Sequence, residues 1–149
     1  APGLRYFDKL AVKIGGGFNH RVGLYDGVML KDNHIAYAGS ITKAVEKVRQ
    51  QIGQMVKIEV EIETEAQLHE AIAAKADIIM LDNMSTELML QAVEMIKGQA
   101  LVEASGGVNL LTIENIAKTG VDIISVGAIT HSVMALDISL DIGEIKVNK

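Results

Sequence analysis

The chain has 149 residues, of which 49% are hydrophobic, and it carries a formal net charge of −5. Because it contains no cysteine, disulfides and thiolate metal sites are excluded, and no apolar run reaches the length that spans a membrane. The acidic balance argues against a general nucleic-acid binder and no secretory signal pattern opens the chain, so we expect a cytoplasmic protein that binds neither nucleic acid nor membrane.

The charge is distributed unevenly along the chain. Residues 1–35 hold five Lys or Arg residues against three Asp, whereas the remaining residues hold 9 basic and 16 acidic side chains. A cationic segment in an acidic protein, with His20 and His34 beside it, suits a small anionic ligand. Charge alone does not separate this interpretation from chance.

The predicted elements alternate in a regular rhythm. A short helical stretch precedes the break at Gly15–Gly17, and from residue 28 short apolar runs alternate with amphipathic helical patterns. The runs lie at residues 28–30, 56–62, 78–81, 100–102 and 123–126, and their β-branched residues are typical of buried parallel strands. This rhythm has the length of a βα unit. It predicts an α/β fold with parallel strands, either part of a (β/α) barrel or a doubly wound sheet.

Sequence signals also predict where helices begin between these runs. Residues 41–52 place apolar side chains on one helical face. Thr64 and Gln67 fit a capping box before the next helix. Ser85 and Asn109 are predicted to cap the two helices that follow.

Polar or glycine residues follow every predicted strand. In both architectures, ligands bind at the carboxyl ends of the strands, so these residues are candidates for one site. A single polar strand end usually only starts a loop, but five in one chain favour a functional edge. The candidates are Lys31 and Asp32, then Glu59, Glu61 and Glu63, Asp82 and Asn83, Glu103 and Ser105–Gly107, and Gly127 with Thr130, His131 and Ser132.

The residue types suggest tasks at such an edge. Lys31, His20 and Arg21 can bind carboxylates or phosphates. Glu61 and Asp82 can hold ribose hydroxyls, a Mg²⁺ ion or a developing cation. The glycine turns in "SGG" and "VGAITHS" allow the backbone to approach a phosphate. The histidines at 20, 34 and 131 lack metal-ligand spacing, which disfavours a transition-metal site.

Six motifs in order carry a resemblance to a known family. They are "PGLR", "GGGFNHRVGLYDGVMLKDNHI", "EVE", "MLDN", "ASGGV" and "SVGAITHS". With them the chain closely resembles the barrel domain of the quinolinate phosphoribosyltransferases, through to "ALDISLDI" near its end. The resemblance implies that residues 1–149 form a partial (β/α) barrel catalytic domain, in an enzyme that acts as a homo-oligomer, a dimer or higher.

The resemblance also implies a reaction and its residues. Quinolinate attacks phosphoribosyl pyrophosphate, and pyrophosphate and CO₂ leave to give nicotinate mononucleotide, a precursor of NAD, with Mg²⁺ on the donor. It implies that His20 and Arg21 bind the quinolinate carboxylates and that Lys31 lies between acid and donor. By the same resemblance, Glu61 and Asp82 face the ribose and the Mg²⁺ ion, directly or through water. The implied phosphate-site residues are Ser105, Gly106, Gly107, Gly127 and His131.

The amino end departs from the family pattern. Family members carry a separate α/β domain and a first barrel strand that ends in Thr-Arg-Lys-Thr before the point that corresponds to Ala1. We therefore expect a barrel incomplete at its N-terminal end, and a fragment with little activity alone. Alternatives are a phosphate-binding barrel enzyme of other specificity, such as the molybdenum-operon homologues, a non-catalytic ligand-binding piece, or a structural α/β domain.

Overall fold

The computed structural model describes residues 2–140 and 142–143, and its centre is a five-stranded parallel sheet with the strand order β1-β2-β3-β4-β5. The strands span Val28–Leu30, Ile58–Ile62, Ile78–Asp82, Leu101–Ser105 and Ile123–Ile124. A doubly wound sheet reverses its strand order at a switch point, whereas this order follows the chain. The predicted α/β fold is therefore confirmed as the barrel type.

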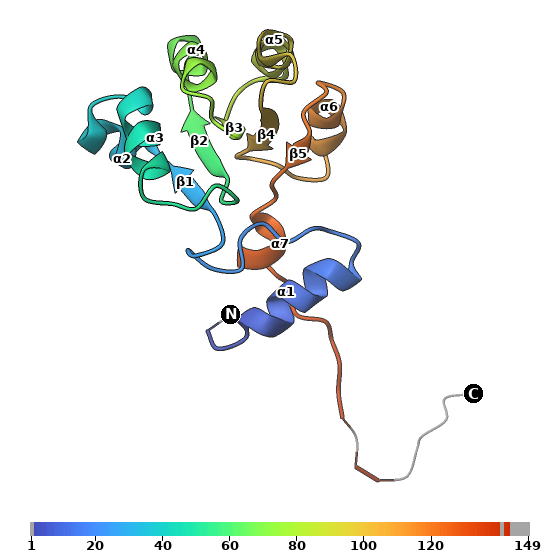
Figure 1. The fold of residues 1–149 in the computed structure, drawn as a ribbon. Helices are drawn as coiled ribbons and strands as arrows, with labels where there is room; N and C mark the ends of the chain where they lie inside the picture. Colours follow the sequence, from blue (N-terminus) through green and yellow to red (C-terminus); the bar gives the residue numbers. More distant parts are fainter. Residues whose placement is uncertain (1, 141, 144–149) are drawn as a thin grey trace.

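The helices cover one side of the curved sheet. Helices α2 to α6 lie along the outside of the arc of strands, while α1 and α7 lie on the opposite side, beyond the strand ends (Figure 1). The helix bounds are Arg5–Ile14 for α1, Asp32–Ala38 for α2, Ile41–Arg49 for α3, Glu65–Ala73 for α4, Thr86–Ile96 for α5, Ile113–Ala117 for α6 and Ala128–His131 for α7. Within the described ranges, no helix has the length and apolarity needed to cross a membrane.

The two faces of the sheet differ in chemistry. In β2, Ile58, Val60 and Ile62 are buried in the core that the outer helices complete. Because side chains alternate along a strand, Glu59 and Glu61 lie on the other face. The hydrophobic core therefore forms between sheet and helices, and polar side chains are left to the inside of the arc.

Most of the predicted helix starts are confirmed. Thr64 Oγ1 accepts from the backbone N–H of Gln67 at 3.3 Å, and Ser85 Oγ accepts from Leu88 N–H at 3.4 Å. The predicted Asn109 cap is wrong, because α6 begins later, after Thr112. The Asn109 side chain instead closes a turn by accepting from Leu111 N–H at 2.9 Å.

Two aspartates, one directly before β3 and one directly before β5, each bind the backbone of a neighbouring strand. Asp77 Oδ2 accepts from the backbone N–H of Ile58 on the neighbouring strand at 2.7 Å, and Asp122 Oδ2 accepts from Val102 N–H at 2.8 Å. Asp77 Oδ2 also lies 2.6 Å from Arg49 of α3. Each side chain thereby supplies a partner for a backbone N–H near the start of the neighbouring strand, at the amino ends of the strands.

Replacing Asp77 with alanine is expected to lower the free energy of unfolding by about 1–3 kcal/mol, because a backbone N–H at a buried residue loses its acceptor. Urea denaturation with an unchanged m-value would measure this loss. The control is Glu114→Gln, which removes an exposed 2.7 Å ion pair with Lys118 and should cost no more than about 0.5 kcal/mol. Equal losses in the two variants would contradict the assigned role of Asp77.

Candidate functional site

The inside of the arc forms one open cavity of about 1140 Å³. Side chains from all five strands and from the loop before β1 line it. The expected convergence of strand ends is present, since the candidates that line the cavity are His20, Arg21, Lys31, Glu59, Glu61, Asp82, Glu103, Ser105, Gly127 and Thr130. Gly106, Gly107 and His131 are not among the residues that line it.

Lys31 and Glu61 form the ion pair at the carboxyl end of β1 and β2. Pairing of Leu30 with Val60 places the next residues of both strands side by side, and Lys31 Nζ donates to Glu61 Oε2 at 2.6 Å. This hydrogen bond is the main reason that the pKa of Lys31 is raised. The side chain remains 48% exposed, so its ammonium group is also open to a ligand.

Asp82 ends β3 beside this pair. Its Oδ2 accepts from the Asn83 amide at 2.8 Å, and its negative charge contributes to the raised pKa of Lys31. The other carboxylate oxygens of Glu61 and Asp82 accept no hydrogen bond from any residue that the structure describes. Two carboxylates with available oxygens have the chemistry that Mg²⁺ prefers.

The "SGG" turn follows β4 and is tied to the end of β3. Asn83 N–H donates to the carbonyl of Ser105 at 2.9 Å. Gly106 and Gly107 have φ values of +89° and +62°, where residues with a Cβ are strained. A Cβ on Gly106 would also overlap the Asn83 amide. Both φ and space therefore favour glycine at position 106, and Ser105 is the residue of the turn that reaches the cavity.

The last strand end contributes differently from the expectation. Gly127 lines the cavity and precedes α7, whose final residue is His131. The exposed His131 ring packs back on this turn, because a Cβ on Gly127 would lie 3.0 Å from its Cδ2. Its Nδ1 lies 2.6 Å from Ser132 Oγ.

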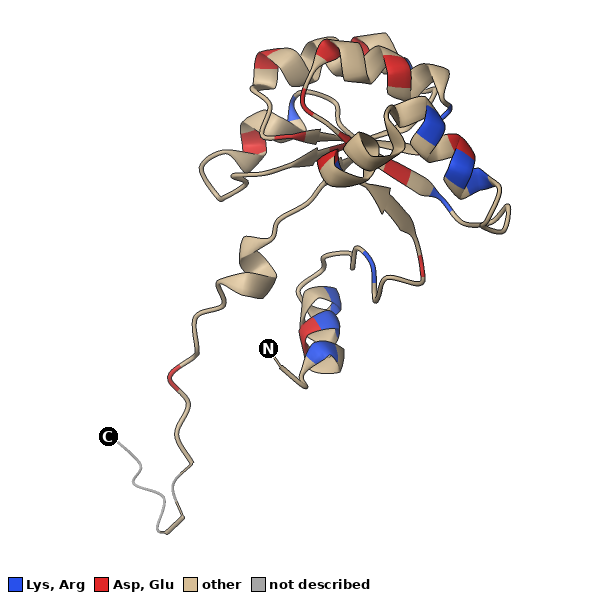
Figure 2. Cartoon of the chain, turned by 90° about the vertical axis from the view of Figure 1, so that its left-hand side faces the viewer, with Lys and Arg blue, Asp and Glu red and all other residues tan. Residues whose placement is uncertain are grey.

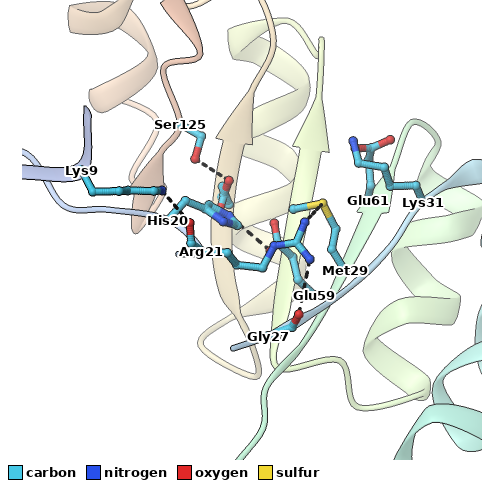
Figure 3. A network of polar contacts seen from close by, with 10 residues as sticks. Lys9, His20, Arg21, Gly27, Met29, Lys31, Glu59, Glu61 and Ser125 are labelled. Atoms are coloured by element: carbon cyan, nitrogen blue, oxygen red, sulfur yellow. Dashed lines mark hydrogen bonds and ion pairs between the residues drawn. The ribbon is translucent and has the colours of Figure 1, made fainter. Parts of the chain in front are cut away.

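Arg21 is held in the loop before β1. Its guanidinium donates to the carbonyl of Gly27 at 3.3 Å and contacts Met29 Sδ at 3.7 Å. Lys9 of α1 donates to the Arg21 carbonyl at 2.5 Å, so the helix anchors the loop that carries the cation (Figure 3). Lys and Arg residues recur along α1, as Figure 2 shows.

His20 occupies a position that the sequence did not reveal. Its Nε2 lies 3.3 Å from Glu59 Oε2 and 3.5 Å from Glu103 Oε2, and Ser125 Oγ donates to Glu103 Oε1 at 2.6 Å (Figure 3). The hydrogen bond that the ring donates to Glu103, and then that to Glu59, raises the pKa of His20 to about 10. Glu103 and Glu59 were visible as strand residues, but only the three-dimensional register shows that both meet His20.

Comparison with known proteins gives a consistent family. The sequence model described as "Quinolinate phosphoribosyl transferase, C-terminal domain" matches residues 1–141. A "Probable nicotinate-nucleotide pyrophosphorylase [carboxylating]" of Bacillus subtilis (strain 168) is 55% identical over 141 residues, which are 95% of this chain and 49% of the relative.

A second relative and a solved structure agree with this match. The protein of the same description from Synechocystis sp. is 51% identical over 146 residues, 95% of this chain and 49% of that protein. The solved structure of the nicotinate-nucleotide pyrophosphorylase from Francisella tularensis has a TM-score of 0.88 and 50% identity, and the match covers 93% of this chain and 49% of that one. The chain thus spans about half the length of the curated relatives it matches.

Proposed function

The chain belongs to the quinolinate phosphoribosyltransferase family, whose C-terminal domain it matches, and on this basis we propose that it carries the substrate cavity of such an enzyme in NAD biosynthesis. The reaction joins the quinolinate nitrogen to the anomeric carbon of phosphoribosyl pyrophosphate and breaks the bond to pyrophosphate. The ring then loses its 2-carboxylate as CO₂, the pyridinium nitrogen accepts the bonding electrons, and a proton replaces the carboxylate to give nicotinate mononucleotide.

One observation carries this proposal: cations and carboxylates from separate elements line one cavity. His20, Arg21 and Lys31 supply positive charge for a dianionic acid and a polyanionic donor. Glu61 and Asp82 supply negative charge where positive charge develops on the ribose as pyrophosphate leaves. A purely structural domain has no need for this arrangement.

We assign His20 and Arg21 to the quinolinate carboxylates and Lys31 to a position between acid and donor. A guanidinium can bind a carboxylate through two parallel hydrogen bonds, and the contacts of Arg21 within the chain are long, at 3.3 and 3.7 Å. Its donors can therefore turn to a substrate without the loss of a strong internal bond.

Glu61 and Asp82 would hold Mg²⁺, directly or through water, because their available oxygens suit it. When bound, the ion would neutralise charge on the pyrophosphate. Ser105 and Gly127 would contact the donor phosphate, and Gly106 and Gly107 shape the turn that presents Ser105. His131 would contribute only if its ring turned from Ser132 toward the cavity.

We further propose a cytoplasmic homo-oligomer of two or more subunits that binds neither membrane nor nucleic acid. Helix α1 supports an assembly, because its apolar side chains Tyr6, Phe7 and Ile14 are 73%, 62% and 77% exposed. A partner segment that covers them would remove apolar area from water. Light scattering after gel filtration tests this assembly, and a monomer at micromolar concentration would contradict it.

Replacing Arg21 with alanine is expected to weaken quinolinate binding by about 1.5–3 kcal/mol, because a charge-assisted contact is lost. Binding of phosphoribosyl pyrophosphate should change much less. Calorimetry with each ligand measures both effects, and Lys13→Ala, on an exposed part of α1 outside the cavity, is the control.

Two results would count against the proposal in different ways. Equal losses for both ligands in the Arg21 variant would mean that the acid-site assignment is wrong. If the unsubstituted chain binds neither quinolinate nor the donor in the presence of Mg²⁺, the proposed function itself is wrong.

A further inference from the structure

Glu59 and Glu103 are two carboxylates buried at the inside of the arc. Their exposed fractions are 4% and 1%. They come from β2 and β4, and strand β3 runs between them. Carboxylates in such surroundings need a cation or hydrogen-bond donors to remain charged.

His20 is the group that meets both carboxylates. It enters from the loop before β1, and the same nitrogen, Nε2, faces Glu59 and Glu103 at 3.3 and 3.5 Å. Ser125 donates to the far oxygen of Glu103, whereas Oε1 of Glu59 is buried and accepts no hydrogen bond from the described residues. The carboxylates therefore depend on the imidazole proton, and they favour the protonated ring.

The other imidazole nitrogen is left for a ligand. Within residues 2–140 and 142–143, Nδ1 of His20 has no hydrogen-bond partner. The side chain is 35% exposed and lines the cavity. An imidazolium held at Nε2 presents Nδ1–H as a charged donor, which binds a carboxylate more strongly than a neutral ring does.

We propose that Glu59 and Glu103 are positioning residues that hold His20 by Nε2, keep its ring cationic and present its Nδ1–H to a carboxylate of the substrate acid. This inference rests on the proposed function, because the acid is quinolinate. The glutamates touch neither substrate nor donor and act only through His20. Neither carboxylate belongs to the pair assigned to Mg²⁺.

No other charged group that the structure describes near His20 holds its ring as Glu59 and Glu103 do. Arg21 is next to His20 in the loop, but its guanidinium points to Gly27 and Met29. Lys9 of α1 is bound to the Arg21 carbonyl. None of the remaining charged residues that line the cavity contributes to the raised pKa of His20; they are Asp26, Lys31, Lys57, Glu61, Asp82 and Asp122.

A metal ion is the competing occupant of the cluster. One ligand atom each from His20, Glu59 and Glu103 lies within 4.8 Å of the others, which is close enough for shared coordination. Binding would require that Nε2 lose its proton, however, and a pKa of about 10 makes that loss costly at neutral pH. We therefore expect the cluster to hold a protonated ring and not a metal ion.

The experiment follows the His20 ring by NMR in chain labelled at histidine. In the unsubstituted chain, His20 should stay protonated from pH 6 to 9. In Glu103→Gln, the pH midpoint of the His20 titration should fall by more than about one pH unit, because the carboxylate that raises the pKa most is gone. Ser125→Ala removes a donor to Glu103 but keeps the carboxylate charge, so it is the matched variant in which His20 should stay protonated over the same range.

Calorimetry then links the ring to the acid. Quinolinate affinity in Glu103→Gln should fall about tenfold relative to the unsubstituted chain between pH 6.5 and 8.5, as the contact loses its charge. Affinity for phosphoribosyl pyrophosphate should not follow this profile. A merely structural glutamate would lower stability without a change in the pH dependence of binding.

The outcomes separate the inference from the proposed function. A His20 midpoint near 6.5 in the unsubstituted chain, or no change in Glu103→Gln, would overturn the inference whatever the ligand does. Loss of the His20 Nε2 proton at neutral pH on addition of micromolar Zn²⁺ would make the cluster a metal site and overturn it as well. A cationic His20 in a chain that binds no quinolinate at any pH would instead refute the proposed function.

Discussion

Replacing His20 with alanine should lower the free energy of unfolding by about 3 kcal/mol at neutral pH, the lower end of the range for breaking a buried ion pair. Glu59 and Glu103 would remain buried at 4% and 1% exposure without the cation that both face. The lower end applies because the His20 side chain is 35% exposed, so water can replace part of the lost contact.

The pH dependence of this loss has a definite sign. The folded-state pKa of His20, about 10, lies above the ordinary value of 6.5, so the folded state binds the proton more tightly than the unfolded state. The stabilisation is fully present below about pH 6.5 and is lost as the pH rises through about 10. The difference between the unsubstituted chain and the variant should therefore shrink from pH 6.5 to pH 9.5.

Urea denaturation at pH 6.5, 8 and 9.5 measures both parts of this prediction. His69→Ala is the matched control, because its side chain is 67% exposed and lies 3.9 Å from Glu65 on the surface of α4; the cost should be below about 0.5 kcal/mol. A difference that grows with pH would show that His20 is neutral in the folded chain.

The strands could be predicted because buried parallel strands have a distinctive local composition. Short β-branched runs such as residues 78–81 have one stable solution in an α/β chain, a parallel strand covered by helices. The choice between barrel and doubly wound sheet depends on strand order, which no local pattern contains. Helix α2 escaped prediction because its seven residues, Asp32–Ala38, begin at once after the strand-end Lys31 and contain no buried residue.

The candidate site was also predictable only where local sequence determines it. Lys31, Glu61, Asp82 and Ser105 follow from the rule that parallel strands end at one edge, and they line one cavity. The pairing of Glu59 and Glu103 with His20 could not be predicted, because it depends on how the loop before β1 folds. That loop places His20 against side chains of β2 and β4, and β3 lies between these two strands. The helix start at Asn109 was wrong for a related reason: a turn residue and a cap residue have the same side-chain chemistry.

Replacing Lys31 should weaken ligand binding strongly and change stability little, whereas replacing His20 should lower stability. Replacing Lys31 with alanine is expected to weaken binding of phosphoribosyl pyrophosphate with Mg²⁺ by about 1.5–3 kcal/mol, roughly ten- to a hundredfold in the dissociation constant. The ammonium group is the cation that lies 2.6 Å from Glu61 at the mouth of the cavity. Its removal would leave Glu61 and Asp82 facing the donor without a compensating positive charge.

Stability should change little in the Lys31 variant, because the pair is exposed on the lysine side, at 48%, and such pairs contribute at most about 1 kcal/mol. Calorimetry with the donor and urea denaturation of the same variant separate the two effects, with Lys43→Ala, an exposed lysine of α3 outside the cavity, as the control. A large loss of stability with unchanged donor binding would make Lys31 a structural residue. The expected result, weak binding in a stable fold, would instead mean that this lysine is kept at the strand end for the ligand, while His20 is held in place by the protein's own buried charges.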